Sequence, residues 1–163
     1  MEEKKKILLM YATHGTGHKA VACNIEDYLS KKDKYEIKQI DILDYNRKFL
    51  GDFTEKFYEF SMYHMPAVWH LIYRTTDNKV AGGISSKLLA SCLNNKKLKK
   101  VVEDFNPDLI ISTHFTSSSY ISKLKKSGEL DAHLISVVTD YKAHRVWLDS
   151  YKSEDALIVN SPE

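Results

Sequence analysis

The sequence predicts an α/β fold, a Rossmann-like doubly wound parallel sheet, and two observations carry this prediction. Apolar segments of strand length recur along the chain, and segments with helical apolar spacing separate them. Segments that alternate in this way and are joined by short turns form a parallel sheet with helices on its faces. The 163 residues, of which 43% are hydrophobic, suffice for a single domain with one core.

The first three segments form a β-α-β unit. Residues 6–11 (KILLMY) are a continuous apolar run, which is typical of a strand that is buried on both faces. Residues 18–31 carry apolar side chains at helical spacing, so they predict a helix. Residues 35–42 alternate between apolar and polar side chains, as a second strand does.

The middle of the chain departs from this pattern. Between residues 46 and 76, aromatic side chains recur at three- or four-residue steps, which predicts an insertion of two short helices. After a Gly-Gly break, a helix is predicted over residues 84–105, with an interruption near 94–95 and an end before Pro107. The remaining predicted elements are the strands 108–113, 133–139 and 156–159 and the helix 117–126.

Composition excludes several classes of protein. The 24 Lys and Arg residues nearly balance 22 Asp and Glu, so no field that gathers nucleic acid is expected. Cys23 and Cys92 lack the pairing of a zinc or disulfide framework, and both are expected to be reduced core residues. The first apolar run is too short for a signal peptide, and no run of about 18 apolar residues occurs. We therefore expect a cytoplasmic protein whose membrane contact, if any, is peripheral.

Polar residues directly follow three of the predicted strands. They are His14 to His18, Thr113 with His114, and the segment from Thr139 and Asp140 to Trp147. Because ligands of open α/β sheets bind at the carboxyl ends of the strands, we expect these groups to converge on one crevice. Neither a Gly-x-Ser-x-Gly elbow nor a P-loop is present, which argues against the common serine-hydrolase and nucleoside-triphosphatase classes.

The turn after the first strand supports two interpretations. Gly15, Gly17 and Ala20 satisfy the pattern of a dinucleotide-binding turn, and Asp41 is nearly in place for the ribose hydroxyls of NAD(P) or FAD. Alternatively, His18 at the helix start is a general base, because the helix dipole disfavours the cationic form of a histidine there. A third possibility for His18 is simple packing or capping of the turn.

Three stretches together resemble the family of monogalactosyldiacylglycerol synthases and processive diacylglycerol glucosyltransferases. They are ILLMYATHGTGHKAVA, DLIISTHFTSS and VVTDYKAHRVWL, in matching order and spacing. The resemblance covers residues 1–163 and implies the N-terminal, acceptor-binding half of a GT-B fold. It also implies transfer of galactose or glucose from a UDP-sugar to membrane diacylglycerol, with inversion and with no further cofactor. The domain that binds most of the nucleotide sugar would be absent, so the isolated chain should be almost inactive.

The resemblance and the strand-end pattern together assign roles. His18 matches the histidine of the family's glycine-rich loop and is the expected base, with Asp140 as the carboxylate that fixes its tautomer. Asp140 has an alternative role, as a cap of the turn that follows Thr139. The acceptor is expected to contact His114, His144 and Trp147, although Trp147 would equally anchor its loop to the core. Donor phosphates are expected at Gly15, Thr16 and Gly17. No metal is expected, because the histidines lack an H-E-x-x-H arrangement.

The aromatic insertion is the expected route to the membrane. Its aromatic side chains lie near Lys and Arg residues, a combination that suits an anionic membrane surface. Phe53 and Phe57 are therefore expected to contact the lipid acceptor. The alternative is that the aromatic residues of the insertion pack in the protein core. A non-enzymatic peripheral membrane module remains a third hypothesis for the chain. The sequence gives no indication of the oligomeric state.

Overall fold

Five parallel strands form one sheet in the computed structural model of the chain, which describes residues 3–13, 16–45, 60–61, 64–65, 67, 95–140 and 145–160. The strands are β1 (Lys5–Tyr11), β2 (Tyr35–Asp41), β3 (Leu109–Ser112), β4 (His133–Val137) and β5 (Ala156–Ile158), in the order β2-β1-β3-β4-β5. Strand order reverses direction between β1 and β3, so this pair marks the topological switch point of the sheet.

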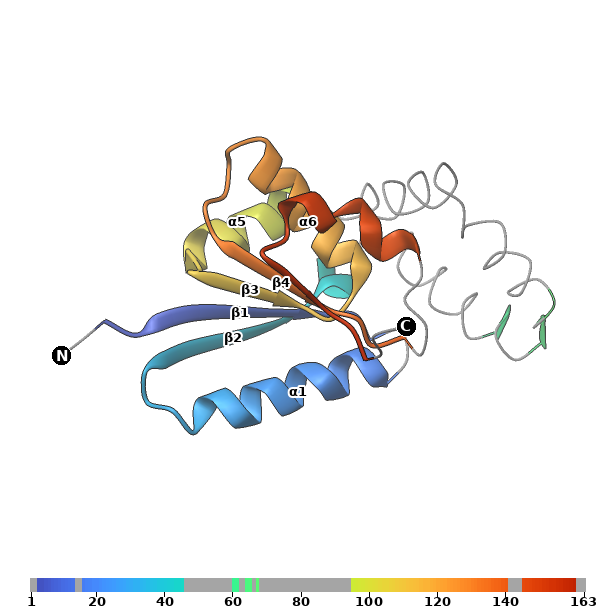
Figure 1. Cartoon of the computed structure of the whole chain (residues 1–163), viewed down its shortest axis with the longest axis horizontal. Helices are drawn as coiled ribbons and strands as arrows, with labels where there is room; N and C mark the ends of the chain where they lie inside the picture. The colour runs from blue at the N-terminus through green and yellow to red at the C-terminus, as the bar shows by residue number, and fades with distance from the viewer. Residues whose placement is uncertain are drawn as a thin grey trace.

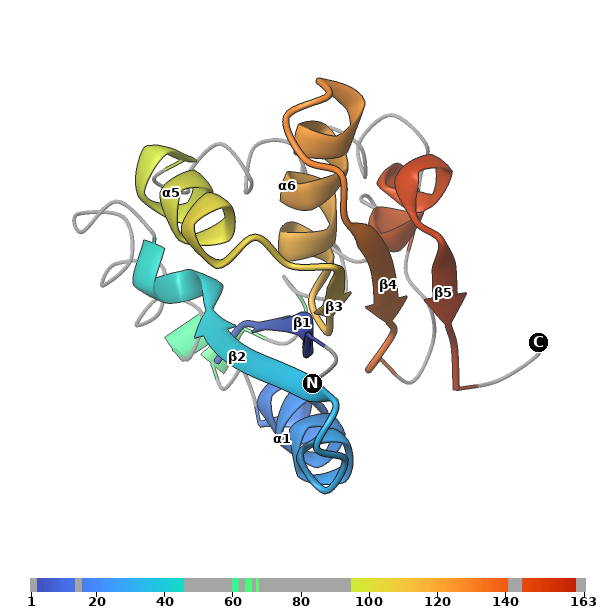
Figure 2. The ribbon, with the colours of Figure 1, turned by 90° about the vertical axis from the view of Figure 1, so that its left-hand side faces the viewer.

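Helices lie on both faces of the sheet. Figures 1 and 2 show α1 (Gly17–Ser30) on one face, beneath β1 and β2. The opposite face carries α5 (Asn95–Phe105) and α6 (Phe115–Lys126). Short 3-10 helices complete the described elements, namely η1 (Ile42–Tyr45), η2 (Arg145–Asp149) and η3 (Tyr151–Ser153). The doubly wound parallel architecture is thus confirmed.

The central strands are buried because helices cover both of their faces. In β1, residues 7–10 are all buried, which explains why the segment is apolar without alternation. Ile7 and Leu9 face α1, where Ile25 and Leu29 pack against them. The alternate side chains of the strand, Leu8 and Met10, belong to the larger core beneath α5 and α6. The continuous hydrophobic pattern therefore reflects two separate cores on either side of one strand.

Local sequence signals set where α5 and α6 end. Asn106 follows α5 with a positive φ of 49°, and Pro107 then prevents the helix from continuing. After α6, Gly128 takes a φ of 72°. The N–H of Glu129 donates to the Leu124 carbonyl at 3.0 Å, which is the long bond of a Schellman motif. Both helices thus stop where the chain turns back to the amino edge of the sheet.

One carboxylate, that of Asp155, joins β4 to the start of β5 and to α6. The backbone N–H of Leu134 donates to Asp155 at 2.8 Å, His133 Nδ1 lies 2.8 Å from it, and Lys125 Nζ lies 3.0 Å from it. The Leu134 N–H, followed by the His133 contact, holds the pKa of Asp155 well below its usual range. Asp155 therefore stabilises the fold as a charged group.

The strands and helices predicted outside the insertion are confirmed to within a few residues, with three differences. The helix predicted from residue 117 begins at Phe115. The 3-10 helices were not predicted, since their turns carry little apolar periodicity. Cys23, expected in the core, is half-buried, whereas Cys92 lies outside the described residues. Most of the predicted insertion, and the predicted helix before residue 95, also lie outside them.

Candidate active site

Two histidines meet where β1 and β3 end. His18 is the second residue of α1, directly after the turn that leaves β1, and His114 precedes α6 at the end of β3. Their ring centroids lie 4.8 Å apart, with the planes at 82°. The pair therefore occupies the switch point of the sheet, where open α/β proteins bind their ligands. The sequence predicted this convergence correctly for these two residues.

The Nδ1 atom of His18 lies between two oxygen atoms. The carbonyl oxygen of Thr113 and the Oγ1 of Thr139 are each 2.6 Å from it. Because a carbonyl oxygen can only accept, Nδ1 must carry a proton. In the neutral ring, Nε2 is then unprotonated and able to accept a proton. Within the described part of the chain, no group hydrogen-bonds to that Nε2.

His114 has the opposite arrangement. The backbone N–H of Thr116 donates to its Nδ1 at 3.2 Å, so His114 is the N-cap of α6. A nitrogen that accepts this bond has no proton, and the neutral His114 ring therefore carries its proton on Nε2. The helix predicted from residue 117 thus begins directly after His114, which caps it. A histidine replaces the usual small polar cap because its ring nitrogen reaches the same N–H group.

A network of buried serine hydroxyls supports the backbone at His114. Its carbonyl oxygen accepts from Ser112 Oγ at 2.9 Å and from Ser117 Oγ at 2.7 Å. Ser118 Oγ then joins Ser112 Oγ, at 2.9 Å, to Ser136 Oγ, at 2.7 Å. Buried hydroxyls that satisfy one another in this way hold the ends of β3 and β4 in a single arrangement. The network fixes the position from which His114 faces His18.

Asp140 and Trp147 bond to each other rather than to His18. The indole Nε1 of Trp147 donates to Asp140 Oδ2 at 2.7 Å, and the Trp147 side chain is fully buried. The prediction that Asp140 orients the His18 ring is therefore corrected. Thr113 and Thr139 supply the oxygen atoms near Nδ1 instead. The predicted acceptor contact of Trp147 is also corrected. A fully buried ring packed against Phe115 anchors its loop to the core.

Thr16 and Gly17 lie at the amino end of α1, next to His18. Thr16 is the N-cap, but its side chain makes no capping hydrogen bond, and the first turn holds no acidic residue. The first N–H groups of a helix have no partner within the helix, so this end can receive an anion. Several residues predicted for the site lie outside the described residues. They are Gly15, His144, Phe53 and Phe57, together with His14, which was expected in the same crevice.

Two features count against the dinucleotide interpretation of this turn. In that motif the third small residue lets the helix pack closely on the strand, but Ala20 is exposed and Ala22 is the buried residue. The carboxylate expected on a ribose is also engaged, since Asp41 Oδ1 accepts from the Leu43 N–H at 2.9 Å. The sequence therefore matches the glycine pattern of a dinucleotide-binding turn, but Ala20 does not make the close helix–strand contact that the pattern normally provides.

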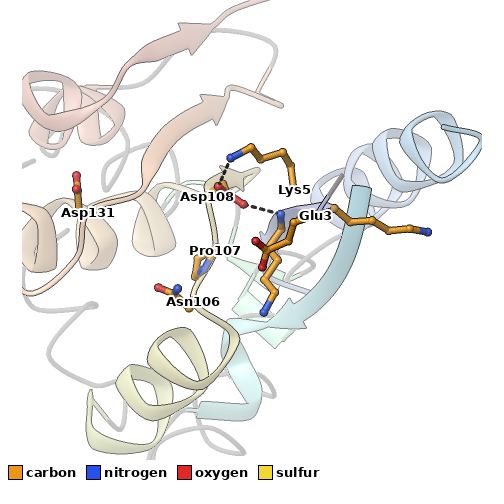
Figure 3. Close-up of a pocket in the computed structure, with 8 residues that line it drawn as sticks. Glu3, Lys5, Asn106, Pro107, Asp108 and Asp131 are labelled. Atoms are coloured by element: carbon orange, nitrogen blue, oxygen red, sulfur yellow. Dashed lines mark hydrogen bonds and ion pairs between the residues drawn. The ribbon is translucent and has the colours of Figure 1, made fainter. Parts of the chain in front are cut away.

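A groove of about 310 Å³ lies at the opposite edge of the sheet from His18. Figure 3 shows it at the amino ends of β1 and β3, lined by charged and polar side chains. Lys5 Nζ lies 2.9 Å from Asp108 Oδ1, and this contact raises the pKa of Lys5 and lowers that of Asp108. The groove lies at the amino ends of the strands, where ligands of open α/β sheets do not usually bind, and its Lys5 and Asp108 charges pair with each other. These features favour a structural role for the groove. The His18 crevice is the better candidate.

Sequence reasoning missed the roles of Thr139 and of the buried serines. In the sequence, Thr113 and Thr139 stand out only as neighbours of histidine and aspartate. The available signal was their position, since Thr113 directly follows β3 and Thr139 lies two residues after β4, at the same edge of the sheet. As for metals, the described residues contain no group of three or more side chains able to hold an ion.

Comparisons with known proteins identify the family that the chain resembles. A family model described as "Monogalactosyldiacylglycerol (MGDG) synthase" matches residues 18–163 and so begins at His18. A protein of Bacillus cereus (strain B4264) named "Processive diacylglycerol beta-glucosyltransferase" is 26% identical over 151 residues. Proteins with the same name from Bacillus thuringiensis (strain Al Hakam) and Bacillus anthracis (strain CDC 684 / NRRL 3495) are 25% identical. Each match covers 91% of this chain and 37% of the relative, and no solved structure matches significantly.

Proposed function

The chain belongs to the monogalactosyldiacylglycerol synthase family, and from this premise we propose that it is the acceptor-activating part of a glycosyltransferase acting on diacylglycerol. The donor in this proposal is a UDP-hexose, either UDP-glucose or UDP-galactose. The names of the Bacillus relatives support glucose and the family description supports galactose. These relatives are longer than the chain, which spans 37% of their length.

The observation that carries the proposal is the protonation pattern of His18. Thr113 holds the proton on Nδ1, so Nε2 is the basic atom and makes no hydrogen bond within the described residues. In the proposed reaction the acceptor hydroxyl oxygen bonds to the anomeric carbon while His18 Nε2 takes the hydroxyl proton. The bond between that carbon and the UDP oxygen breaks, and UDP leaves with the electron pair. No metal or redox cofactor is needed to balance this step.

The stereochemical course that we propose is inversion. A UDP-hexose of this kind carries an α-linked sugar, and the Bacillus relatives are named as beta-glucosyltransferases. One direct displacement converts an α-linked donor into a β-linked product, and it requires a single base on the acceptor side. His18 supplies such a base, whereas the carboxylate that would form a covalent intermediate is not needed.

The donor diphosphate is proposed to approach the amino end of α1. Thr16 and Gly17 leave the first N–H groups there without a side-chain cap, and an anion at this end is favoured by the helix dipole. In this proposal most of the nucleotide sugar is held by the part of the protein that corresponds to the remaining length of the relatives, of which the chain spans 37%. The isolated chain is accordingly expected to show little turnover.

The lipid acceptor places the crevice at a membrane surface in this proposal. In the insertion, the described residues Phe60 and Met65 are 56% and 38% exposed, so apolar side chains are available to a bilayer. Within the described residues, no helix combines the length and apolar character that crossing a bilayer requires. We therefore propose peripheral contact of a cytoplasmic protein with the inner face of the membrane.

The proposal is tested with the complete gene product and a lipid acceptor. Purified protein is incubated with diacylglycerol in mixed micelles and with UDP-glucose or UDP-galactose, and the glycolipid is identified by mass spectrometry and NMR of its anomeric proton. We expect a β-linked hexose on the free hydroxyl of diacylglycerol. An α-linked product would refute the inverting step, and the absence of any glycolipid with either donor would refute the acceptor assignment.

A further inference from the structure

The geometry points to Thr139 as a positioning residue that fixes the protonation state and the plane of the His18 ring. Its hydroxyl oxygen acts together with the Thr113 carbonyl, so that Nδ1 is the protonated atom and Nε2 the basic one. This inference rests on the proposed function, in which Nε2 of His18 takes the acceptor proton. It replaces the carboxylate expected from the sequence with a hydroxyl and a carbonyl group.

The first step of the argument is the direction of each hydrogen bond at Nδ1. Both Thr113 O and Thr139 Oγ1 lie 2.6 Å from this one nitrogen. The carbonyl oxygen has no hydrogen, so it must accept from Nδ1. A hydroxyl that donated to the same nitrogen would need a lone pair that the protonated Nδ1 does not have. Thr139 Oγ1 is therefore a second acceptor, and the N–H is shared between two oxygens, as in other three-centre bonds.

The second step concerns the ring plane. A single hydrogen bond at Nδ1 leaves the ring free to turn about the N–H···O axis, whereas two oxygens on different elements restrict that rotation. Thr113 follows β3 and Thr139 lies two residues after β4, so the oxygens come from neighbouring strands. Thr113 Oγ1 also donates to the His18 carbonyl at 3.0 Å, which holds the start of α1. Backbone and ring are thus held separately.

The third step is what happens when Nε2 receives a proton. The ring becomes an imidazolium ion, and both oxygens then accept from a charged donor, which strengthens the hydrogen bonds. The stabilisation appears only as the proton is transferred, so losing one oxygen should lower kcat more than it changes KM. For one hydrogen bond to a charged group we expect kcat to fall about tenfold or more. Thr139 supplies the side chain through which this can be tested, because the Thr113 contact to the ring comes from the backbone.

The direct test is the tautomer of His18 in the 163-residue chain. Long-range 1H–15N correlation spectra at about pH 8.5, where an ordinary histidine is neutral, distinguish protonated from unprotonated ring nitrogens. The His18→Gln variant assigns the signals by their loss. We expect a protonated Nδ1 in the wild type and in Thr139→Ser. In Thr139→Val a methyl group replaces the hydroxyl and only the Thr113 carbonyl still favours a protonated Nδ1, so we expect part of the population to shift to the tautomer protonated on Nε2. A protonated Nε2 in the wild type or in Thr139→Ser, or an unchanged tautomer in a folded Thr139→Val, would overturn the proposal.

Turnover by the complete gene product separates this inference from the proposed function. We expect Thr139→Val to lose kcat about tenfold with KM nearly unchanged, and Thr139→Ser to restore most of it. If His18→Gln kept wild-type turnover while the tautomer results held, the base assignment would fail and the positioning role would stand. If His18→Gln lost turnover but Thr139→Val matched the wild type in kcat and tautomer, the positioning role alone would fail.

Discussion

Replacing Trp147 with phenylalanine distinguishes a core anchor from a residue that contacts the acceptor. The side chain is fully buried, and its Nε1 donates to Asp140 Oδ2 at 2.7 Å. Trp147→Phe keeps most of the apolar contacts but removes the donor, which leaves a half-buried carboxylate oxygen without its partner. A hydrogen bond to a charged group contributes about 1.5–3 kcal/mol, and the partial exposure of Asp140 favours the lower end of this range. We therefore expect a loss of about 2 kcal/mol in the free energy of unfolding.

Thermal and urea unfolding of the chain measure this loss. At about 2–4 °C for each kcal/mol in a protein of this size, Tm should fall by roughly 4–8 °C. Leu148→Ala is the matched control, because Leu148 follows in the same 3-10 helix but is 46% exposed. We expect the control to stay within about 0.5 kcal/mol of the wild type. The anchor assignment is refuted if Trp147→Phe unfolds like the wild type, or if Leu148→Ala is equally destabilised.

Three further outcomes are expected. The pKa of Asp155 is lowered in the folded state, chiefly by the Leu134 N–H, so its stabilisation is present above the unfolded pKa and is lost as pH falls through the folded pKa. Asp155→Asn should lower the free energy of unfolding in urea by about 1 kcal/mol at neutral pH and make that free energy depend less on pH in acid. An unchanged pH dependence of unfolding would contradict this. Ser118→Ala leaves two buried hydroxyls short of a partner and should lower the free energy of unfolding by about 1–3 kcal/mol, whereas wild-type urea stability would argue against a continuous network. Phe60→Ser should weaken co-sedimentation with anionic vesicles, and binding equal to that of the wild type would exclude Phe60 from the membrane contact.

The sheet was predictable from the sequence because its central strands obey a simple physical rule. Residues 7–10 are buried on both faces, and only a continuous apolar run fits such a place. The helix that follows has apolar side chains at helical spacing, since one side of it packs on the sheet. Segments whose burial is set by one neighbouring layer can be located from periodicity alone.

The site was predictable in position but only partly in chemistry. The carboxyl ends of parallel strands meet at one edge, so the positions of His18 and His114 after their strands suffice to place them together. Which group contacts Nδ1 depends on the direction of the Thr113 carbonyl after β3 and of the Thr139 side chain after β4, and these directions have no signature in spacing. Asp140 was the expected partner because carboxylates often orient histidines, but its oxygen is taken by the Trp147 indole.

The role of Trp147 shows a related limit. A tryptophan after a strand end is apolar and also carries a donor, so it suits a ligand site and a core equally well. Only burial separates the two, and burial depends on Phe115 and Val146, which come from a neighbouring helix and from the same turn. Long-range packing of this kind cannot be deduced from local sequence.

The proton-accepting role of His18 is tested most directly by the turnover number of His18→Ala in the complete gene product. His133→Ala is the control, because this exposed histidine begins β4 at the opposite edge of the sheet. With diacylglycerol and UDP-sugar both saturating, we expect His18→Ala to lose at least about a hundredfold in kcat, in line with loss of a general base. His133→Ala should keep near-wild-type kcat. A folded His18→Ala protein that turned over at the wild-type rate would show that His18 is not the base.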